Sequence, residues 1–260
     1  MLSMVTREQL DDLFKLKYDD LKGGWGPGQR LKFGYFTPDD VYEATIDSLV
    51  TPDTTWLDVG CGRDIFPSNF RLAKMLSERC RLLVGLDPSD NIEENQIIHE
   101  RFKGFLEDFP AGRQFDLVTL RMVAEHIAHP AGAARALARL AKPGGRIVIY
   151  TVFKWSPVTL VSAAAPFWLH HAVKRIIWNT EEKDTFPTEY RMNTRRELRR
   201  IMTSVGFAEE QFSYLDDCRS LARWKLTNLL ELVLWKILTS AGLHYPEVCI
   251  IGVYRKPFSA

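Results

Sequence analysis

The sequence predicts an α/β fold in which a mostly parallel β-sheet carries helices on both faces. Short runs that are nearly continuous in Val, Leu and Ile alternate with amphipathic helical patterns along the chain. Strands that are buried on both faces of a parallel sheet have this composition. The chain has 260 residues, of which 46% are hydrophobic and 26% charged. It is therefore long enough for one large domain with a substantial core.

The first core helix begins at a clear start signal. Thr37 has the side chain of a helix N-cap, Pro38 suits the first helical position, and two aspartates follow in the first turn. We therefore expect a helix over 37–49. The apolar pattern that follows predicts alternating elements, with strands at 54–60, 81–87, 102–109 and 115–121 and helices at 67–80, 91–100 and 126–140.

The C-terminal half continues the alternation. The run RIVIYTVF follows a PGG turn and predicts a strand over 146–153. Thr194 and Glu197 have the spacing of a capping box, which predicts a helix that ends near Gly206. A long apolar stretch, interrupted by four charged residues, predicts an amphipathic helix. This helix is expected at 221–243, and the last strands at 210–215 and 248–256.

We expect a single domain with an apolar insert after the fifth strand. Its parts are an N-terminal cap (1–36), a ligand-binding core (37–153), a lid (154–193) and C-terminal helices with the last strands (194–260). Within the lid, residues 155–173 include no Lys, Arg, Asp or Glu, and their number approaches that of a membrane span. Pro157 and Pro166 would break a spanning helix. A lid that faces the ligand is therefore favoured over a membrane-surface helix.

The net charge and the cysteines indicate which partners and which cellular compartment to expect. The formal net charge is +1, so we expect a small-molecule partner and no nucleic acid. The four cysteines are far apart and show no CxxC or metal-ligand spacing. The N-terminus has acids early and no apolar signal-peptide core. These features predict a cytoplasmic protein with reduced thiols and without a bound metal.

The stretch WLDVGCGRD raises the question of which ligand its glycine loop binds. A phosphate-binding P-loop is excluded because Gly62 is followed by Arg-Asp-Ile instead of the required residues. A dinucleotide loop needs a small residue where this chain has Ile65. Asp58, two residues before the first glycine, would repel a pyrophosphate. The loop therefore favours a ligand that carries positive charge.

S-adenosylmethionine (SAM) is such a ligand, and four motifs resemble the class I SAM-dependent methyltransferases. They are LDVGCGRD, VGLDPSD, FDLVTLRMVAEHIAHP and KPGGRIVIY. The third and fourth are similar to the ubiquinone/menaquinone-biosynthesis-type branch of that family. The resemblance covers roughly 37–153. It implies a Rossmann-like, seven-stranded, mostly parallel sheet, SAM as cofactor and S-adenosylhomocysteine (SAH) as product.

The resemblance also implies which residues bind the cofactor. Asp58 is placed to meet the ammonium group, the two loop glycines let the backbone approach the methionine portion, and Asp87 is placed for the ribose hydroxyls. Cys61 between the glycines is expected to pack and not to act as a nucleophile. The family often has an acid where this chain has Phe105, so adenine contact falls to the next two residues. The expected cofactor-binding residues are Asp58, Gly60, Cys61, Gly62, Asp87, Pro88, Leu106, Glu107 and Leu120.

Two residues near the end of the fourth strand are candidates for catalysis. Arg121 could bind an anionic group of the methyl acceptor, or could equally be a surface arginine paired with a neighbour. His126 aligns with the EH pair of the family and could act as general base, although a packing or capping role is the alternative. Substrate contacts are expected from the cap and the lid, at Trp25, Tyr35, Trp155, His170, Tyr190 and Arg191.

The predicted activity is in-line transfer of a methyl group from SAM to a small, largely hydrophobic metabolite. The acceptor atom is expected to be oxygen or nitrogen, with a carboxylate or carbon as variants. Positioning carries most of the catalysis, because the methyl carbon is already activated by its positive sulfur. Two alternatives stay open: a catalytically inactive SAM-fold protein that serves as a binding partner or scaffold, and an NAD-dependent oxidoreductase.

Overall fold

The computed structural model describes residues 5–19, 24–157, 159–160 and 186–258. A seven-stranded sheet in the order β3-β2-β1-β4-β5-β7-β6 forms its centre. All strand pairs are parallel except those that β7 makes with β5 and β6. The strands are β1 (Thr55–Val59), β2 (Leu82–Asp87), β3 (Glu100–Lys103), β4 (Phe115–Arg121), β5 (Ala141–Val152), β6 (Ala208–Asp216) and β7 (Glu247–Arg255). The predicted seven-stranded, mostly parallel α/β fold is confirmed.

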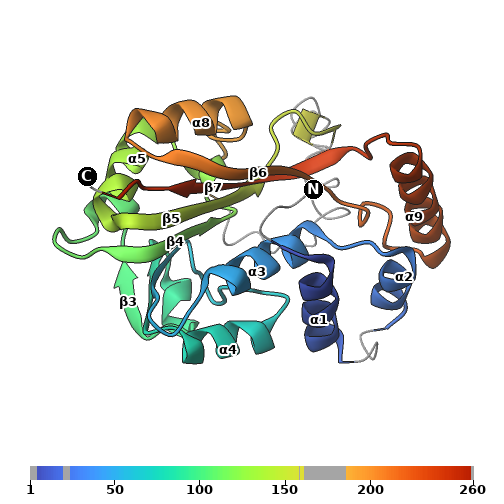
Figure 1. Cartoon of the computed structure of the whole chain (residues 1–260), viewed down its shortest axis with the longest axis horizontal. Coiled ribbons are helices and arrows are strands. Elements are labelled where there is room, and N and C mark those ends of the chain that lie inside the picture. The colour runs from blue at the N-terminus through green and yellow to red at the C-terminus, as the bar shows by residue number, and fades with distance from the viewer. Residues whose placement is uncertain (1–4, 20–23, 158, 161–185, 259–260) are drawn as a thin grey trace.

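Helices cover both faces of the sheet, and each face has its own apolar core (Figure 1). On one face lie α3 and α4, which pack through residues such as Tyr42 and Leu72 against Trp56 of β1. The other face carries α5 and α8, which pack through Leu137 and Leu198. These helices are α3 (Pro38–Leu49), α4 (Phe70–Arg79), α5 (Pro130–Leu140) and α8 (Arg195–Ser204).

The helix starts follow from the predicted capping residues. Thr37 Oγ1 accepts a hydrogen bond from Asp40 N, and the Asp40 carboxylate accepts one from Thr37 N, so a complete capping box begins α3. Thr194 Oγ1 accepts from Glu197 N at the start of α8. The Glu197 carboxylate accepts a hydrogen bond from the Thr194 hydroxyl and not from the Thr194 backbone N–H. This start of the helix therefore differs from a complete capping box.

The helix predicted over 91–100 is wrong. The chain forms a short 3-10 helix η1 (Asp90–Glu94) and then enters β3 at Glu100. Asn95 ends the helical turn because its Oδ1 accepts from Ile97 N, and its Nδ2 donates to the carbonyl of Gly62. The weak strand predicted over 102–109 therefore occurs earlier, and a second 3-10 helix, η2 (Leu106–Asp108), occupies its C-terminal half.

The N-terminal cap contains two helices that the sequence analysis did not predict, α1 (Arg7–Tyr18) and α2 (Trp25–Phe33). A capping box between Thr6 and Gln9 starts α1. Helix α2 lies beside α9 (Lys225–Ser240) at one end of the molecule (Figure 1). Within the described ranges, no helix combines the length and the apolar character needed to cross a membrane.

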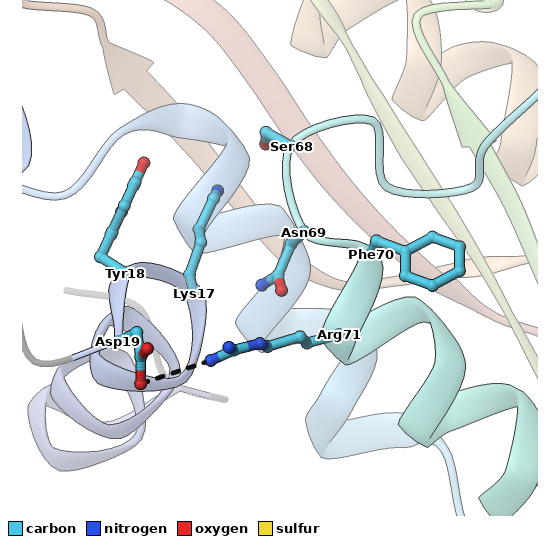
Figure 2. A pocket seen from close by; sticks show the side chains of 7 residues that line it. All are labelled: Lys17, Tyr18, Asp19, Ser68, Asn69, Phe70 and Arg71. Atoms are coloured by element: carbon cyan, nitrogen blue, oxygen red, sulfur yellow. Dashed lines mark ion pairs between the residues drawn. The ribbon is translucent and has the colours of Figure 1, made fainter. Parts of the chain in front are cut away.

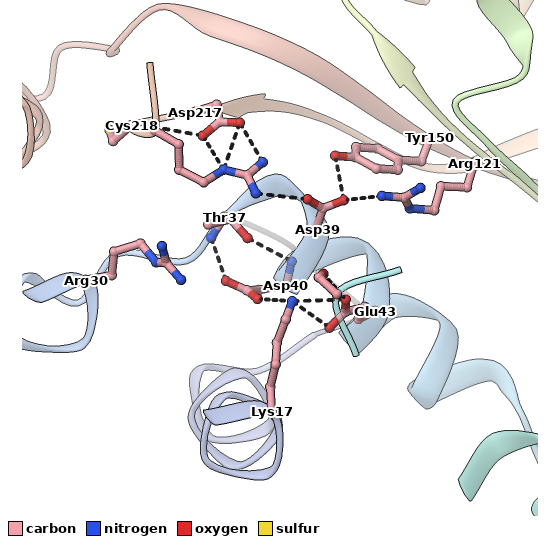
Figure 3. Close-up of polar contacts among 12 residues, drawn as sticks. Lys17, Arg30, Thr37, Asp39, Asp40, Glu43, Arg121, Tyr150, Asp217 and Cys218 are labelled. Atoms are coloured by element: carbon pink, nitrogen blue, oxygen red, sulfur yellow. Dashed lines mark hydrogen bonds and ion pairs between the residues drawn. The ribbon is translucent and has the colours of Figure 1, made fainter. Parts of the chain in front are cut away.

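Charged residues are buried where the cap meets α3 (Figure 3). Lys17 Nζ lies 2.8 Å from Asp40 Oδ1 and 3.0 Å from Glu43 Oε1, and all three side chains are at most 5% exposed. Burial lowers the pKa of Lys17, but the two carboxylates outweigh it and the net shift is upward. This cluster fixes the cap to the core by ion pairs and not by apolar contact alone.

Candidate active site

The main cavity opens at the carboxyl ends of β1, β2 and β4. Its volume is about 750 Å³, within the roughly 300–1,000 Å³ of small-molecule sites. Open parallel sheets bind ligands at this edge, where the strand order reverses. The cavity is lined by Val59, Gly60, Leu86, Asp87, Pro88, Gly104, Phe105, Leu106, Glu107, Asp108, Met122, Val123, His126, Ile127, Ala128, His129, Gly132, Ala133, Phe186, Pro187 and Glu189.

Gly60 forms the floor of the cavity directly after β1. Its φ of 72° lies in the left-handed region that favours glycine. A Cβ built at Gly60 would lie 2.2 Å from Cγ2 of Val123. Gly62 also has a positive φ, of 45°, but nothing lies within 4 Å of a Cβ built there. The loop therefore needs glycine at position 60 for both conformation and space.

Asp87 holds its carboxylate at the end of β2, on the cavity wall. One oxygen accepts from Gly62 N at 2.9 Å, and the other accepts from Ser89 N at 2.8 Å and from the Ser89 hydroxyl. A carboxylate can accept about four hydrogen bonds. The three observed bonds orient the group and leave capacity for a ligand hydroxyl.

Asp58 lies one layer below the cavity surface and is 3% exposed. Its Oδ1 accepts from Thr119 Oγ1, which in turn accepts from Trp56 Nε1 at 2.7 Å. Burial raises the pKa of Asp58 to about 7, although the Thr119 hydrogen bond and the charge of Arg121 oppose the shift. A cation that binds above Asp58 would favour its ionised form.

His126 forms part of the opposite wall, in the short 3-10 helix η3 (Ala124–His126). Its Nδ1 lies 2.9 Å from the carbonyl oxygen of Pro187. Because a carbonyl can only accept, the neutral ring carries its proton on Nδ1 and leaves Nε2 as an acceptor. The segment that supplies Pro187 is tied down by Glu189 N and Tyr190 N, which both donate to the Glu125 carbonyl.

The family model described as "Methyltransferase domain" matches residues 35–211, which is more than half of the chain. The chain belongs to this methyltransferase family. The resemblance to class I SAM-dependent methyltransferases is thereby confirmed, and SAM is the cofactor.

Curated relatives match a shorter stretch. A ubiquinone biosynthesis O-methyltransferase of Pseudomonas paraeruginosa is 31% identical over 108 residues, which cover 38% of this chain and 44% of the relative. A protein of the same name from Pseudomonas fluorescens is 31% identical over 111 residues, which cover 37% of this chain and 43% of the relative. The chain thus matches less than half the length of these relatives.

Solved structures share the fold at low sequence identity. One is a chain of the complex that contains the Haloferax volcanii Trm112 methyltransferase activator, with a TM-score of 0.56, 14% identity and 98% coverage of both chains. Another is the YcgJ protein of Bacillus subtilis, with a TM-score of 0.51, 14% identity, and coverage of 86% of this chain and 99% of that chain. At this identity the likeness concerns the fold alone.

The charge of the cavity fits the SAM cofactor of the methyltransferase family. Four acids line it, at Asp87, Glu107, Asp108 and Glu189, and its described lining includes no Lys or Arg. Glu189 pairs with Arg191 at 3.1 Å, and the other three acids form no ion pair with another residue that the structure describes. SAM carries a sulfonium and an ammonium, so an acidic site attracts it, whereas a pyrophosphate would be repelled.

The remaining predicted cofactor residues lie in or beside the methyltransferase cavity. Pro88, Leu106 and Glu107 line it with Gly60 and Asp87. Asp58, Cys61, Gly62 and Leu120 are not part of the lining. The Cys61 thiol packs 2.7 Å from where a Cβ of Gly85 would lie, and burial raises its pKa. This agrees with a packing role, and direct cofactor contacts of these four residues stay predictions.

Arg121 turns away from the cavity and pairs with Asp39 of α3 (Figure 3). Its Nη2 lies 2.9 Å from Asp39 Oδ1, and Arg219 Nη1 lies 3.1 Å from the other oxygen. Burial raises the pKa of Asp39, but Arg121 and Arg219 outweigh it and the net shift is downward. The geometry is that of an arginine paired with a neighbour. A contact between Arg121 and the acceptor stays a prediction.

The predicted substrate contacts lie outside the cavity lining as far as the structure describes them. Tyr35 is buried, and its hydroxyl donates to the Asp216 carbonyl and accepts from Cys218 N. Trp25 begins α2, and Trp155 is exposed beside Lys154. Tyr190 and Arg191 directly follow the lining residue Glu189 in the chain, and His170 lies outside the described residues.

A second hollow of about 340 Å³ lies between α1 and α4 (Figure 2). Arg71 and Asp19 face each other across it at 3.6 Å, and Lys17 projects from α1. None of the residues predicted from the glycine motifs is among its described lining. Its mixed charges do not select a cation, so the larger cavity is the better candidate for the cofactor site.

Phe105, Met122 and Val123 of the cavity lining were missed by the sequence analysis, whereas Phe186 lies within the lid (154–193) that was expected to face the ligand. Phe105 and Phe186 present their rings at the cavity, and each is more than two-fifths exposed. Phe105 had been noted only as a departure from the family acid. Met122, in the left-handed region at φ 52°, and Val123 follow β4. An exposed aromatic just after a strand was the available signal for Phe105, whereas the position of Phe186 depends on chain folding.

Proposed function

We propose that the protein transfers a methyl group from SAM to an oxygen of a small, largely apolar acceptor. The observation that carries this proposal is one cavity that joins an acidic, glycine-floored end to a wall with a histidine and apolar side chains. The name of the curated relatives, ubiquinone biosynthesis O-methyltransferase, supports oxygen over the nitrogen and carbon acceptors that the sequence also allowed.

The cofactor end of the site is built from Gly60, Asp87 and η2. Gly60 lets the backbone approach the ligand, and the Asp87 carboxylate would accept hydrogen bonds from the ribose hydroxyls. Leu106 and Phe105 lie beside Asp87 in the cavity wall. We infer that the exposed Phe105 ring covers the adenine, since aromatic faces stack on bases. When bound, SAM supplies a methyl group on a positively charged sulfur.

The acceptor end is defined by His126 and the apolar residues around it. The hydrogen bond from Nδ1 to Pro187 holds the ring in one tautomer and leaves Nε2 to take the proton of an acceptor hydroxyl. Phe186 packs edge-on against His126, with 6.2 Å between the ring centroids. Met122, Val123 and Ile127 add an apolar lining, which excludes water and suits a greasy acceptor.

Calorimetric titration with SAH tests the cofactor half of the proposal. We expect micromolar binding to the purified protein. Methyl transfer is then tested with three acceptors on one alkylated benzene scaffold: a catechol, an aniline and a benzoate, with SAH release as the readout. Preferred turnover of the catechol supports oxygen transfer with a base. Binding of SAH without turnover of any acceptor would favour the inactive binding protein.

His126→Asn separates base catalysis from packing. Asparagine retains an N–H that can donate to the Pro187 carbonyl but has no basic nitrogen. We expect kcat to fall by about 10²–10⁴-fold with the catechol, while the Kd for SAH is unchanged. An unchanged kcat would assign His126 to packing and leave catalysis to positioning alone.

A further inference from the structure

Helix α9 has an inverted amphipathic pattern. Two of its polar side chains point inward: Asn228 Nδ2 donates to the Cys218 carbonyl, and the buried Glu231 accepts from Leu221 N and from the Tyr245 hydroxyl. Its outward face is apolar and spaced by about one helical turn. The exposed residues of this α9 stripe are Leu226, Leu230, Val233, Leu234 and Ile237.

The exposure of the α9 stripe is large for aliphatic side chains. Leu226 is 67% exposed, Leu230 58% and Ile237 60%. Trp224, at 61%, extends the stripe at the start of the helix. Scattered single apolar residues are normal on a surface, but a contiguous apolar face marks an interaction site.

The exposed charged side chains of residues 221–243 are all positive. Arg223, Lys225 and Lys236 are exposed, and none of them makes an ion pair with another described residue. Arg223 lies over the Trp224 ring, 5.7 Å from its centroid. Glu231 is the only acidic residue between 221 and 243, and it is buried. The stripe thus combines apolar side chains, an interfacial tryptophan and uncompensated cations.

We propose that α9 docks on the surface of a membrane that contains anionic phospholipid. Leucines, a tryptophan and flanking Lys or Arg are the features of helices that lie in the bilayer interface. With 16 residues and buried polar groups on its inner face, α9 lies on such a surface and does not span it. A second copy of the chain is disfavoured because pairing two stripes would bring six like charges together.

This docking site is distinct from the membrane-surface alternative that the sequence analysis considered for residues 155–173. It is independent of the chemistry proposed for the cavity. Docking on a membrane would give the enzyme access to an apolar acceptor in the bilayer, because such a molecule dissolves there and not in water.

Flotation with vesicles tests the proposal with the full chain. Vesicles of phosphatidylcholine with 30% phosphatidylglycerol, roughly the composition of an anionic leaflet, are compared with vesicles of pure phosphatidylcholine. We expect binding to the mixed vesicles. Leu226→Ser/Leu230→Ser should lower the partition coefficient at least about tenfold, since each buried leucine is worth about that factor. Arg223→Gln/Lys225→Gln/Lys236→Gln should lose the preference for anionic lipid, about fivefold per cation.

Phe70→Ser/Met75→Ser provides the matched control, because it also removes two exposed apolar side chains, on α4. It should bind vesicles as the unmodified protein does, and circular dichroism checks that each variant is folded. Equal binding by the stripe variant and the control would overturn the proposal. So would a dimer in light scattering that the stripe variant dissociates while neither protein binds vesicles, which would assign α9 to self-association.

Discussion

Acidic side chains gather in two regions of the molecule, beneath the cap and around the cavity. The two regions differ in whether these acids are paired with cations of the chain. Beneath the cap, Asp39 contacts Arg121 and Arg219, and Asp40 and Glu43 share Lys17. Around the cavity, the lining acids Glu107 and Asp108 form no ion pair within the described ranges, and the carboxylate of Asp87 accepts hydrogen bonds from N–H and O–H groups.

This difference separates charges that hold the fold from charges that await a ligand. A buried carboxylate without a cation is costly, so the cap region is neutralised within the chain. In the cavity, Glu107 and Asp108 are exposed to solvent and tolerate the absence of a cation, whereas the buried Asp87 is stabilised by its hydrogen bonds. The field of these acids attracts a cationic ligand. Substitutions in the cap region should therefore change stability, and those in the cavity should change cofactor affinity.

The largest expected effect is on the cap network. Asp39→Asn leaves Arg121 without its carboxylate and Arg219 with Asp217 alone. We expect the free energy of unfolding to fall by about 3 kcal/mol, at the low end for a broken buried pair because Arg219 is partly exposed. Urea denaturation measures it. Asp12→Asn, which breaks the exposed pair with Lys15, should cost less than about 0.5 kcal/mol; equal losses would contradict the comparison.

Gly60→Ala is expected to come next. Alanine is strained at φ 72°, and its Cβ meets Val123, so we expect a loss of about 2 kcal/mol in unfolding free energy and at least about tenfold weaker SAH binding. Gly62→Ala is the matched control, since its φ is also positive but the space is open. Gly62→Ala should lower the unfolding free energy less than Gly60→Ala does, because its Cβ meets no neighbouring atom. A larger defect in Gly62→Ala would show that conformation, and not space, limits the loop.

Asp87→Asn should weaken SAH binding by about tenfold, because charge-assisted hydrogen bonds are stronger than neutral ones. The unfolding free energy should also fall by about 1 kcal/mol, because an amide NH2 group cannot accept the hydrogen bond from Gly62 N or from Ser89 N. Calorimetry measures the Kd. Asp90→Asn changes an exposed acid at the start of η1 and should leave the Kd unchanged. If both variants bind SAH as the unmodified protein does, Asp87 has only the structural role of orienting Gly62 and Ser89.

The smallest effect concerns pH and Asp58. Since burial raises its pKa to about 7, the folded state binds an extra proton between roughly pH 4 and 7, and this group lowers stability as pH rises through that window. The affinity of the site for the ammonium group of the cofactor should change in the opposite direction and increase as the pH rises, because ionised Asp58 attracts the cation. We expect SAH to bind a few-fold more tightly at pH 8 than at pH 6, and Asp58→Asn to remove this dependence. A pH-independent Kd in the unmodified protein would exclude Asp58 from ligand binding.

Sequence reasoning was most accurate where local chemistry decides the outcome. Gly60 and Gly62 adopt positive φ angles that favour glycine, and Thr37 and Thr194 cap their helices through neighbours three residues away. It failed at 91–100, where Asn95 bonds to the distant Gly62 carbonyl and the chain forms a short 3-10 helix and a loop before β3 instead of an α-helix. Helix α2 was missed because its glycine-rich sequence has weak helical propensity, and its packing against α9 is tertiary.

The sequence by itself determined the seven strands and the helices α3, α4, α5, α8 and α9 in their order, the glycine loop with its acids, and the family, because these depend on residue type and short spacing. Only the tertiary structure decided which charges are neutralised. Arg121 meets Asp39, 82 residues away, and not the cavity. The tertiary structure also decided which face of α9 packs against the protein, because the apolar pattern of its sequence does not tell which face turns inward. Contacts between distant segments fix both outcomes, and periodicity within one segment contains no information about its neighbours.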